Sequence, residues 1–568
     1  MSSSSNGKSE EAEAWYGNLV SWVRNHGGEI HAALDLDVVD KSSRGVKATA
    51  DIDEGSVLIR LPAKLALDGS CLPTTYEVKD ASDHGDDVSG KRTASPWLRC
   101  LTSLLTESAI ARGKATKKKA SDECINYSPY LKSLPESFDT LMDESSWSDT
   151  DVSTLLAGTA LGTVVKEERK AEMMKRRFKL SVVPYLQHTG LLAVGNDSST
   201  SDNDYGDFKR ACACISTRGF HLQRGGQQKE GSCEKAAEST NDYSGPYLLP
   251  FIDLLNHCTE KKCTTLQRDA ADGAFIMVAE RKISAGEEVY HTYGTELTSA
   301  QLLQTFGFVE IGAARRAANK LWNDDQYGIA PATLSAALVL SACRSVMGSS
   351  FPSDLKQAME QNEFEDETWD LSAETGRDVL SHGLISSDIL VAADHVAVLS
   401  DELVTLCCLP FLPDEVYADW SDEPCLWGAE VLEDYYLGKL ALRALMKAIG
   451  TKLGEYTDID ASACGLLKVD NEKDNCDKDR ALLTHLLDEP TDPVGYKKRS
   501  KAISALTIRL EEKHCLDLLK KEVIDTLKSL DDDGEGYFYE DDDSNKGDDN
   551  KRSASSDGAD SFSKKIKL

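Results

Sequence analysis

Apolar residues near the start of the chain recur at the spacing of an amphipathic helix. The Gly27-Gly28 pair ends this pattern, whose apolar positions are Trp15, Leu19, Trp22 and Val23. Side chains three or four positions apart share one helix face, and glycine commonly ends a helix. Residues 45–67 then contain two β-rich runs separated by the turn Asp53-Glu54-Gly55, which predicts two strands.

The middle of the chain mixes loop, helix and strand patterns. Residues 69–95 are loop-like, and a largely helical region follows to about Tyr185. Cys212 and Cys214 alternate with alanine, which predicts a strand,. Residues 271–280, ADGAFIMVAE, predict a strand of a short hairpin,.

The last third has helical periodicity, most clearly at 429–450 and 501–527,. We therefore predict an α+β protein, a β-rich domain with an inserted helical subdomain followed by an all-helical domain. The expected divisions are a disordered N-terminus at 1–14, the β-rich domain at 15–310 with its insertion at about 95–205, the helical domain at 311–530, and a disordered acidic tail at 531–568,.

Composition narrows the function classes. The 568 residues carry a formal net charge of −32, which argues against direct nucleic-acid binding because phosphate contacts need a basic face. We see no signal peptide, transit peptide or membrane span. We expect a monomer in the cytoplasm, the nucleus or both, with the fifteen cysteines as free thiols,. No second cysteine pair has zinc-finger spacing, so we expect no metal.

Two motifs carry the chemistry. The apolar run YLLPFIDLLNHC ends in Asn256-His257, and EEVYHTYG places Tyr290 and Tyr293 at the end of a strand-like segment. Polar groups at the ends of apolar elements suit a polar ligand or a backbone crossing. Together the motifs resemble SET-domain methyltransferases, in the branch of the Rubisco large-subunit lysine methyltransferase and the actin-histidine methyltransferase. The resemblance implies methyl transfer from S-adenosyl-L-methionine to a lysine-bearing protein substrate.

The resemblance gives residues roles. Tyr293 matches the family's near-invariant tyrosine beside the transferring methyl group, and the alternative is a core tyrosine at a strand end. The cofactor-binding candidates that the resemblance implies are Asn256, His257, Arg218, Asp253, Gly45, Arg44 and Ser42. His257 is expected to hold the crossing, not to act as a base. A surface salt bridge is the alternative for Arg218, and a cap or turn is the alternative for Asp253.

Three aromatic residues are candidates for the substrate channel: Phe220, Tyr290 and Phe306. The Rubisco-type enzymes have an aromatic residue at the position of Phe220, whereas the actin-histidine enzyme has Asn, so Phe220 favours lysine over histidine. Typical members have Glu and an apolar residue at the positions of Ser42 and Arg44. This departure keeps a third hypothesis open, a non-catalytic interaction scaffold.

Overall fold

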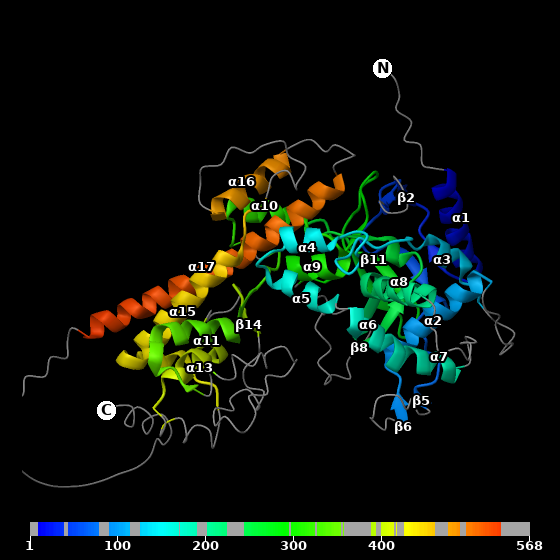
Figure 1. The fold of residues 1–568 in the computed structure, drawn as a ribbon. Coiled ribbons are helices and arrows are strands. Elements are labelled where there is room, and N and C mark those ends of the chain that lie inside the picture. The colour runs from blue at the N-terminus through cyan, green and yellow to red at the C-terminus, as the bar shows by residue number, and fades with distance from the viewer. Residues whose placement is uncertain are drawn as a thin grey trace, which may run out of the picture. The chain divides into compact units, whose positions relative to one another are not determined.

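The computed structural model is an α+β structure, and its ribbon is drawn in Figure 1. The residues that it describes are 10–38, 44–78, 90–113, 125–169, 171–189, 202–223, 243–294, 297–323, 326–353, 356, 388–393, 399–413, 416, 425–459, 475–488 and 496–534. Two compact units divide the chain. We call them the mixed unit (1–153, 163–328 and 490–504) and the helical unit (154–162, 329–489 and 505–568).

The mixed unit contains one four-stranded antiparallel sheet and several two-stranded ribbons. The sheet has the order β1 (Glu29–Ile30), β4 (Val57–Leu61), β11 (Phe275–Ala279), β10 (Thr264–Arg268). The ribbons pair β2 (Leu34–Val38) with β3 (Arg44–Ala48), β5 (Thr75–Val78) with β6 (Gly90–Thr93), β7 (Gly219–Gln223) with β8 (Tyr243–Leu248), and β9 (Asn256–His257) with β12 (Tyr290–His291). Phe275, Met277 and Ala279 alternate inward along β11, as expected for a sheet with one face in the core.

Helices precede, connect and follow these strands in the sequence. They are α1 (Glu10–Asn25), α2 (Pro96–Ala111), α3 (Ser128–Ser133), α4 (Asp149–Leu155), α5 (Ala160–Glu168), α6 (Ala171–Arg177), α7 (Val183–Thr189), α8 (Asp202–Arg218), α9 (Ser299–Phe306) and α10 (Ile311–Asn319). Short 3-10 or π turns lie at η1 (Ala63–Leu65), η2 (Phe178–Val182) and η3 (Ile252–Leu254). Figure 1 shows α1, in dark blue, beside α3. Trp15, Leu19, Trp22 and Val23 are all buried on α1, so the predicted helical face is confirmed.

Local chemistry explains where α9 begins and ends. Thr298 and Gln301 form a reciprocal capping box at its start, which satisfies backbone N–H groups that have no partner in the first turn. Gly307 ends the helix with φ 85°, a conformation that glycine adopts without a steric penalty. The helix therefore ends at Phe306, and Gly307 caps it.

Several sequence predictions differ from the structure. Cys212 and Cys214 lie on α8 and not on a strand, because Phe208, Ala211 and Ile215 with Cys214 form one buried helical face. Residues 69–95 contain β5 and β6 instead of loop alone. Helix α1 begins at Glu10, within the stretch 1–14 that was expected to be disordered.

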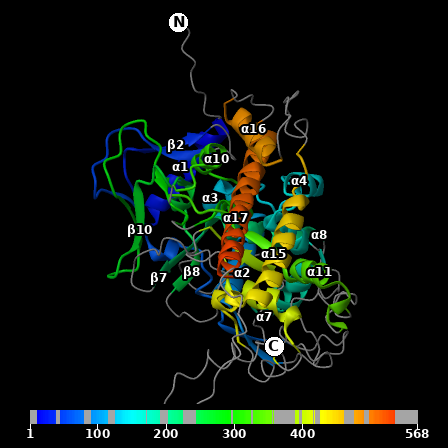
Figure 2. The same ribbon diagram turned by 90° about the vertical axis from the view of Figure 1, so that its left-hand side faces the viewer.

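The helical unit is built on α11 (Ala336–Met347), α13 (Asp401–Cys408), α15 (Tyr435–Glu455) and α16 (Asn475–Asp488), and on α17 (Tyr496–Gly534), which extends past residue 531. Single turns lie at η4 (Gly348–Ser350), η6 (Leu409–Phe411) and η7 (Ala429–Glu433). Figures 1 and 2 both draw α15 alongside α17, whose apolar residues share one core. The prediction of an all-helical domain misses the ribbon of β13 (Ala332–Ser335) and β14 (Asp388–Val391), whose alternating side chains enter that core.

The two units divide between Gly328 and Ile329, after α10, whereas the sequence predicted a boundary near residue 310. Arg316 of α10 is buried and donates to the backbone carbonyls of Tyr327 and Gly328. These bonds attach the end of α10 to the mixed unit. Among the described helices, none has both the length and the apolar character to cross a bilayer.

Candidate active site

The two sequence motifs meet at a short parallel strand pair. Strand β9 pairs with β12, with Asn256 opposite Tyr290 and His257 opposite His291. Tyr293 follows two residues after β12, and its backbone N–H donates to Nδ1 of His257 at 3.1 Å. The rings of Tyr293 and His257 stack with centroids 5.1 Å apart. The crossing therefore fixes the position of Tyr293 through both its backbone and its ring.

The hydrogen bonds of His257 indicate the tautomer of its neutral ring. Nδ1 accepts a backbone N–H, so the ring hydrogen of the neutral form lies on Nε2, which faces Oε2 of Glu310 at 3.4 Å. Glu310 also accepts from the backbone N–H and the hydroxyl of Thr259, both at 2.7 Å. Burial alone would raise the pKa of Glu310, but the bonds from His257 and Thr259 lower it below its usual value,. Both ring nitrogens of His257 are occupied, which suits a structural role.

The Tyr293 hydroxyl lies at the border of a buried polar region. It donates to the backbone carbonyl of Leu255 at 3.2 Å. Burial raises the pKa of Tyr293, and although Arg218 opposes this effect, Asp253 reinforces it,. The phenol is therefore neutral at physiological pH, and because its hydrogen is used on Leu255, its oxygen keeps lone pairs that can accept a hydrogen bond.

Aromatic rings cover one side of Tyr293. Its ring centroid is 4.7 Å from that of Phe306 and 6.5 Å from that of Phe308. The sequence predicted Phe306 but not Phe308, which also lies 5.9 Å from His257. Phe220 is buried and packs against His291, with centroids 6.0 Å apart. The site thus has an apolar wall at Phe306 and Phe308, and Phe220 lies beside the strand that leads to Tyr293.

Asn256 connects β9 to β3 and to a carboxylate that the sequence prediction missed. Its Nδ2 donates to the backbone carbonyl of Arg44 and to Oε1 of Glu288, both at 2.8 Å. The hydroxyl of Tyr290 donates to the other oxygen of Glu288 at 2.7 Å, and burial followed by this bond raises the pKa of Tyr290. A Cβ on Gly45 would lie 2.3 Å from Oε1 of Glu288, so a larger residue at this position would displace the carboxylate from Asn256.

Arg218 and Asp253 form a buried pair. Nη1 of Arg218 donates to the backbone carbonyl of Asp253 at 2.6 Å and faces its Oδ2 at 3.5 Å. The hydroxyl of Tyr130, on α3, donates to the same Oδ2 at 3.0 Å. The side chains of Arg218 and Asp253 are 17% and 2% exposed, so their ion pair does not lie on the surface. Burial, followed by the Asp253 charge, raises the pKa of Tyr130.

The backbone just before Asp253 is strained. Phe251 is fully buried and has φ 74° and ψ −42°, close to a γ-turn conformation that is rare for residues other than glycine. Such conformations cost of order 1–3 kcal/mol and tend to lie at functional sites. The conformation of Phe251 turns the chain from β8 into η3, which contains Asp253.

Arg44 is the second buried guanidinium of this region. It lies on β3, is 8% exposed, and donates through Nη1 to the backbone carbonyl of Ser133. Its guanidinium lies 5.6 Å from the ring centroid of Trp15, in a cation–π contact. Ser42, the other residue predicted from this motif, lies outside the described residues.

Several buried polar atoms of the site have no hydrogen-bond partner among the described residues. They are Nη2 of Arg44, Nε of Arg218 and Oδ1 of Asp253. Buried polar atoms in proteins are nearly always hydrogen-bonded, so a group of such atoms indicates a missing polar ligand. In the same described ranges, no group of three or more His, Cys, Asp or Glu side chains could hold a metal ion.

Residues 43–294 match the family model described as the SET domain. Two relatives are N-lysine methyltransferase setd6 of Danio rerio, 26% identical over 47% of this chain and 50% of that protein, and ribosomal lysine N-methyltransferase set11 of Schizosaccharomyces pombe, 22% identical over 51% and 60%. The chain thus matches about half the length of these relatives.

The fold resembles a solved structure titled "Crystal structure of the SET domain of LSMT bound to Lysine and AdoHcy". The TM-score is 0.53 at 16% identity, and the match covers 92% of this chain and 93% of the other. At that identity the likeness establishes the fold, which agrees with the α+β prediction.

Proposed function

This chain carries a SET domain, and we propose that it is an S-adenosylmethionine-dependent protein-lysine N-methyltransferase. The observation that supports this most is the position of the Tyr293 phenol. Hydrogen bonds to His257 and Leu255 hold Tyr293 at the β9–β12 crossing, and the ring of Phe306 packs against it. The relatives described above have names that identify lysine methyltransferases.

The cofactor site that we propose consists of the polar atoms around the crossing. Asn256, Arg218 and Asp253 would hold the cofactor, together with backbone groups of Gly45 and of the β9 strand. The chemistry of these donors fits, because the unpartnered atoms of Arg218 and Asp253 include both a cationic donor and an anionic acceptor. S-adenosylmethionine is a matching ligand, since it carries a carboxylate, an ammonium group and a sulfonium methyl group that is electrophilic when bound.

Tyr293 would orient the attacking amine. A lysine amine has an unperturbed pKa of about 10.4 and must be neutral to act as a nucleophile. The aromatic rings of Phe306 and Phe308 would keep water from the bound amine, which favours the neutral amine over the ammonium form. The Tyr293 oxygen, whose own hydrogen is donated to Leu255, can accept an N–H from the amine and direct its lone pair. His257 has no part in this proton chemistry.

Phe220 supports lysine over histidine as the target. It is buried beside the strand that leads to the crossing, and an apolar ring suits the aliphatic stem of lysine better than a polar imidazole. We propose the role of Tyr290 to be indirect, because its hydroxyl is used on Glu288. Phe306 offers no hydroxyl to a methylated amine.

We also propose a division of roles between the domains. The mixed unit, which holds the β9–β12 crossing, would perform the transfer, and the helical unit would bind the protein substrate. The protein would act as a monomer in the cytoplasm or nucleus, without direct nucleic-acid binding.

The test is transfer of a labelled methyl group from S-adenosylmethionine to proteins of a cell lysate, followed by mass spectrometry of the modified peptides. We expect methylated lysine. Methylated histidine would support the rival activity on the same fold. An absence of both transfer and cofactor binding by the pure protein would support the scaffold hypothesis.

A further inference from the structure

The side chain of Arg44 is unusual for its surroundings. It lies on a strand whose neighbours Gly45, Val46 and Ala48 are also buried. One of its terminal nitrogens binds the Ser133 carbonyl, and the other, Nη2, has no partner in the described part of the chain. Burying a guanidinium costs several kcal/mol unless charge and hydrogen bonds compensate it. The compensation that the described residues provide is incomplete.

The charges around Arg44 leave an excess of positive charge. Arg44 and Arg218 are close enough to act on each other electrostatically, and Asp253 is the carboxylate that acts on both. Burial, and then the Arg218 charge, lowers the pKa of Arg44 to about 10. Glu288, another carboxylate of the site, already accepts from Asn256 and Tyr290. Two guanidinium groups therefore share one carboxylate, and each keeps an unpartnered buried N–H group within the described ranges.

We infer that Arg44 and Arg218 together form a two-guanidinium site for the carboxylate of the methyl donor. A carboxylate has two oxygens and can accept from two guanidinium groups, with stronger hydrogen bonds because both partners are charged. The ligand would supply the negative charge that the cluster lacks. This inference rests on the proposed function and adds a consequence: the protein should discriminate strongly against nucleoside ligands that lack the amino-acid part.

Calorimetry with two probes tests this inference. S-adenosylhomocysteine carries the carboxylate, and 5′-methylthioadenosine lacks the whole amino-acid part. We expect Arg44→Leu to weaken binding of S-adenosylhomocysteine about 10- to 100-fold, equivalent to one lost charge-assisted contact. Binding of 5′-methylthioadenosine should remain unchanged. Arg44→Lys, which keeps the charge but loses the planar donor set, should give a smaller loss for the first probe only.

The matched control is Arg112→Leu. Arg112 lies in the same unit and also pairs with a carboxylate, that of Asp207, but it is exposed. Its replacement should leave both affinities unchanged. Circular dichroism and melting curves establish that each variant folds, and Arg44→Lys provides the test if Arg44→Leu does not.

The inference is overturned if a folded Arg44 variant binds S-adenosylhomocysteine as the unaltered protein does, or if both probes lose affinity equally. These outcomes differ from failure of the proposed function. If the unaltered protein binds no S-adenosylhomocysteine and transfers no methyl group, the proposed function itself fails. If it binds and transfers while Arg44→Leu and Arg44→Lys have no effect, only the role of Arg44 is wrong.

Discussion

Each unit of the molecule buries a cluster of charged side chains, but only one cluster is complete. In the helical unit, Asp479 accepts from Nε of Arg509 at 2.9 Å and from Nζ of Lys513 at 2.7 Å. Glu512 accepts from the Tyr456 hydroxyl at 2.7 Å and from the backbone N–H of Ala160 at 3.0 Å. None of these five side chains has an unpartnered buried atom in the described residues, whereas Arg44, Arg218 and Asp253 of the mixed unit each have one.

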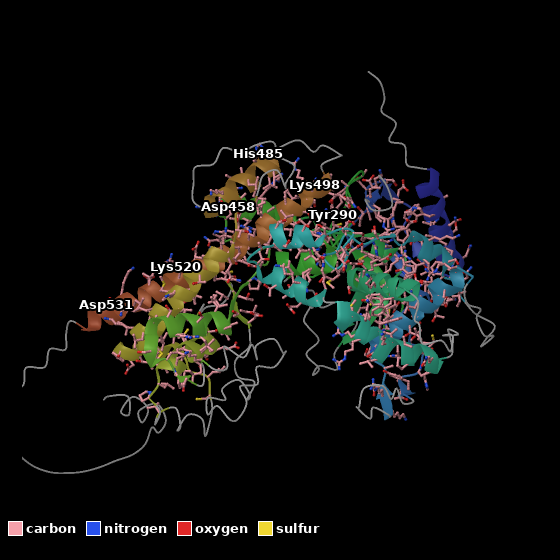
Figure 3. The ribbon with its side chains drawn as sticks, viewed as in Figure 1. Tyr290, Asp458, His485, Lys498, Lys520 and Asp531 are labelled. Carbon is pink, nitrogen blue, oxygen red and sulfur yellow. The ribbon has the colours of Figure 1, made fainter. Side chains whose placement is uncertain are left out.

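The difference separates stability from binding. A buried polar network in which every member is satisfied makes a structure rigid and specific. A cluster with open donors and acceptors is costly unless a ligand completes it. Figure 3 shows the side chains of both units, with Tyr290 labelled in the mixed unit and Asp458, His485, Lys520 and Asp531 in the helical unit. Buried charge alone would have identified both clusters as candidate sites, and hydrogen-bond satisfaction distinguishes them.

The largest expected effect comes from two matched tyrosine substitutions. Tyr293→Phe should lower the rate of methyl transfer about 10²- to 10⁴-fold, the usual contribution of a positioned acid–base or orienting group. Cofactor binding should persist, because the aromatic ring and the backbone bond to His257 remain. Initial-rate assays with labelled cofactor and lysate protein, alongside calorimetry, measure both quantities.

Tyr456→Phe should lower the stability of the protein without changing its transfer rate. It removes the hydroxyl that donates to Glu512, which should lower the free energy of unfolding by about 1–3 kcal/mol because a buried carboxylate loses a donor. The transfer rate per folded molecule should not change. Full activity in Tyr293→Phe would contradict the role proposed for this residue.

Next in size is the contrast between the two buried aspartates. Asp479→Asn removes a charge that faces both Arg509 and Lys513 and should destabilise the protein by about 3–5 kcal/mol, as breaking a buried ion pair does. Asp253→Asn should cost less stability, because Oδ1 of Asp253 has no partner in the described residues and its pairing with Arg218 is long, at 3.5 Å. Urea unfolding of both variants makes the comparison. Equal losses would remove the distinction between the clusters.

The last contrast between the two units is the sign of the pH dependence of stability. Burial lowers the pKa of His291 from 6.5 to about 3. Between pH 6.5 and 3, the imidazole therefore binds a proton in the unfolded chain but not in the folded protein. This contribution to stability is present above pH 6.5 and is lost as the pH falls toward 3, by at most about 1.4 kcal/mol per pH unit. His291→Leu should therefore flatten the acid side of the unfolding profile.

Glu512 in the helical unit has the opposite sign. Burial raises its pKa from 4.5 to about 7, so its contribution is present below pH 4.5 and is lost as the pH rises toward 7. Glu512→Gln should remove that slope while preserving the shape of the side chain. Hydrogen exchange followed across pH 4–8 measures each unit separately, and parallel profiles in both units would refute the assignment.

The sequence predicted the motifs of the site better than their partners. Asn256, His257, Tyr290 and Tyr293 were predicted from apolar runs that end in polar residues, and the β9–β12 pairing brings them together. Tyr130 and Asp253 are 123 positions apart in the chain, so no local pattern could connect them. Glu288 follows Glu287 in a Gly-containing turn that resembles a surface loop, and its contact with Asn256 depends on the crossing of two strands.

Helix and strand patterns were ambiguous where tertiary packing decides. The alternation of Cys and Ala around Cys212 and Cys214 fits a strand, but Cys214 belongs to the buried face of α8 and burial raises the pKa of its thiol to about 12. Over a longer stretch of sequence, apolar residues recur at helical spacing, and this identifies the segment as a helix. The strained backbone of Phe251 has no sequence signal either, since phenylalanine rarely adopts a positive φ.

A crystal structure of the protein with S-adenosylhomocysteine would show where the cofactor binds. We expect the ligand at the β9–β12 crossing, with its carboxylate on Arg218 and Arg44 and its sulfur toward the Tyr293 hydroxyl. The unpartnered nitrogens of both arginines should then be hydrogen-bonded. A ligand bound elsewhere, or one at the crossing whose carboxylate touches neither arginine, would contradict this expectation.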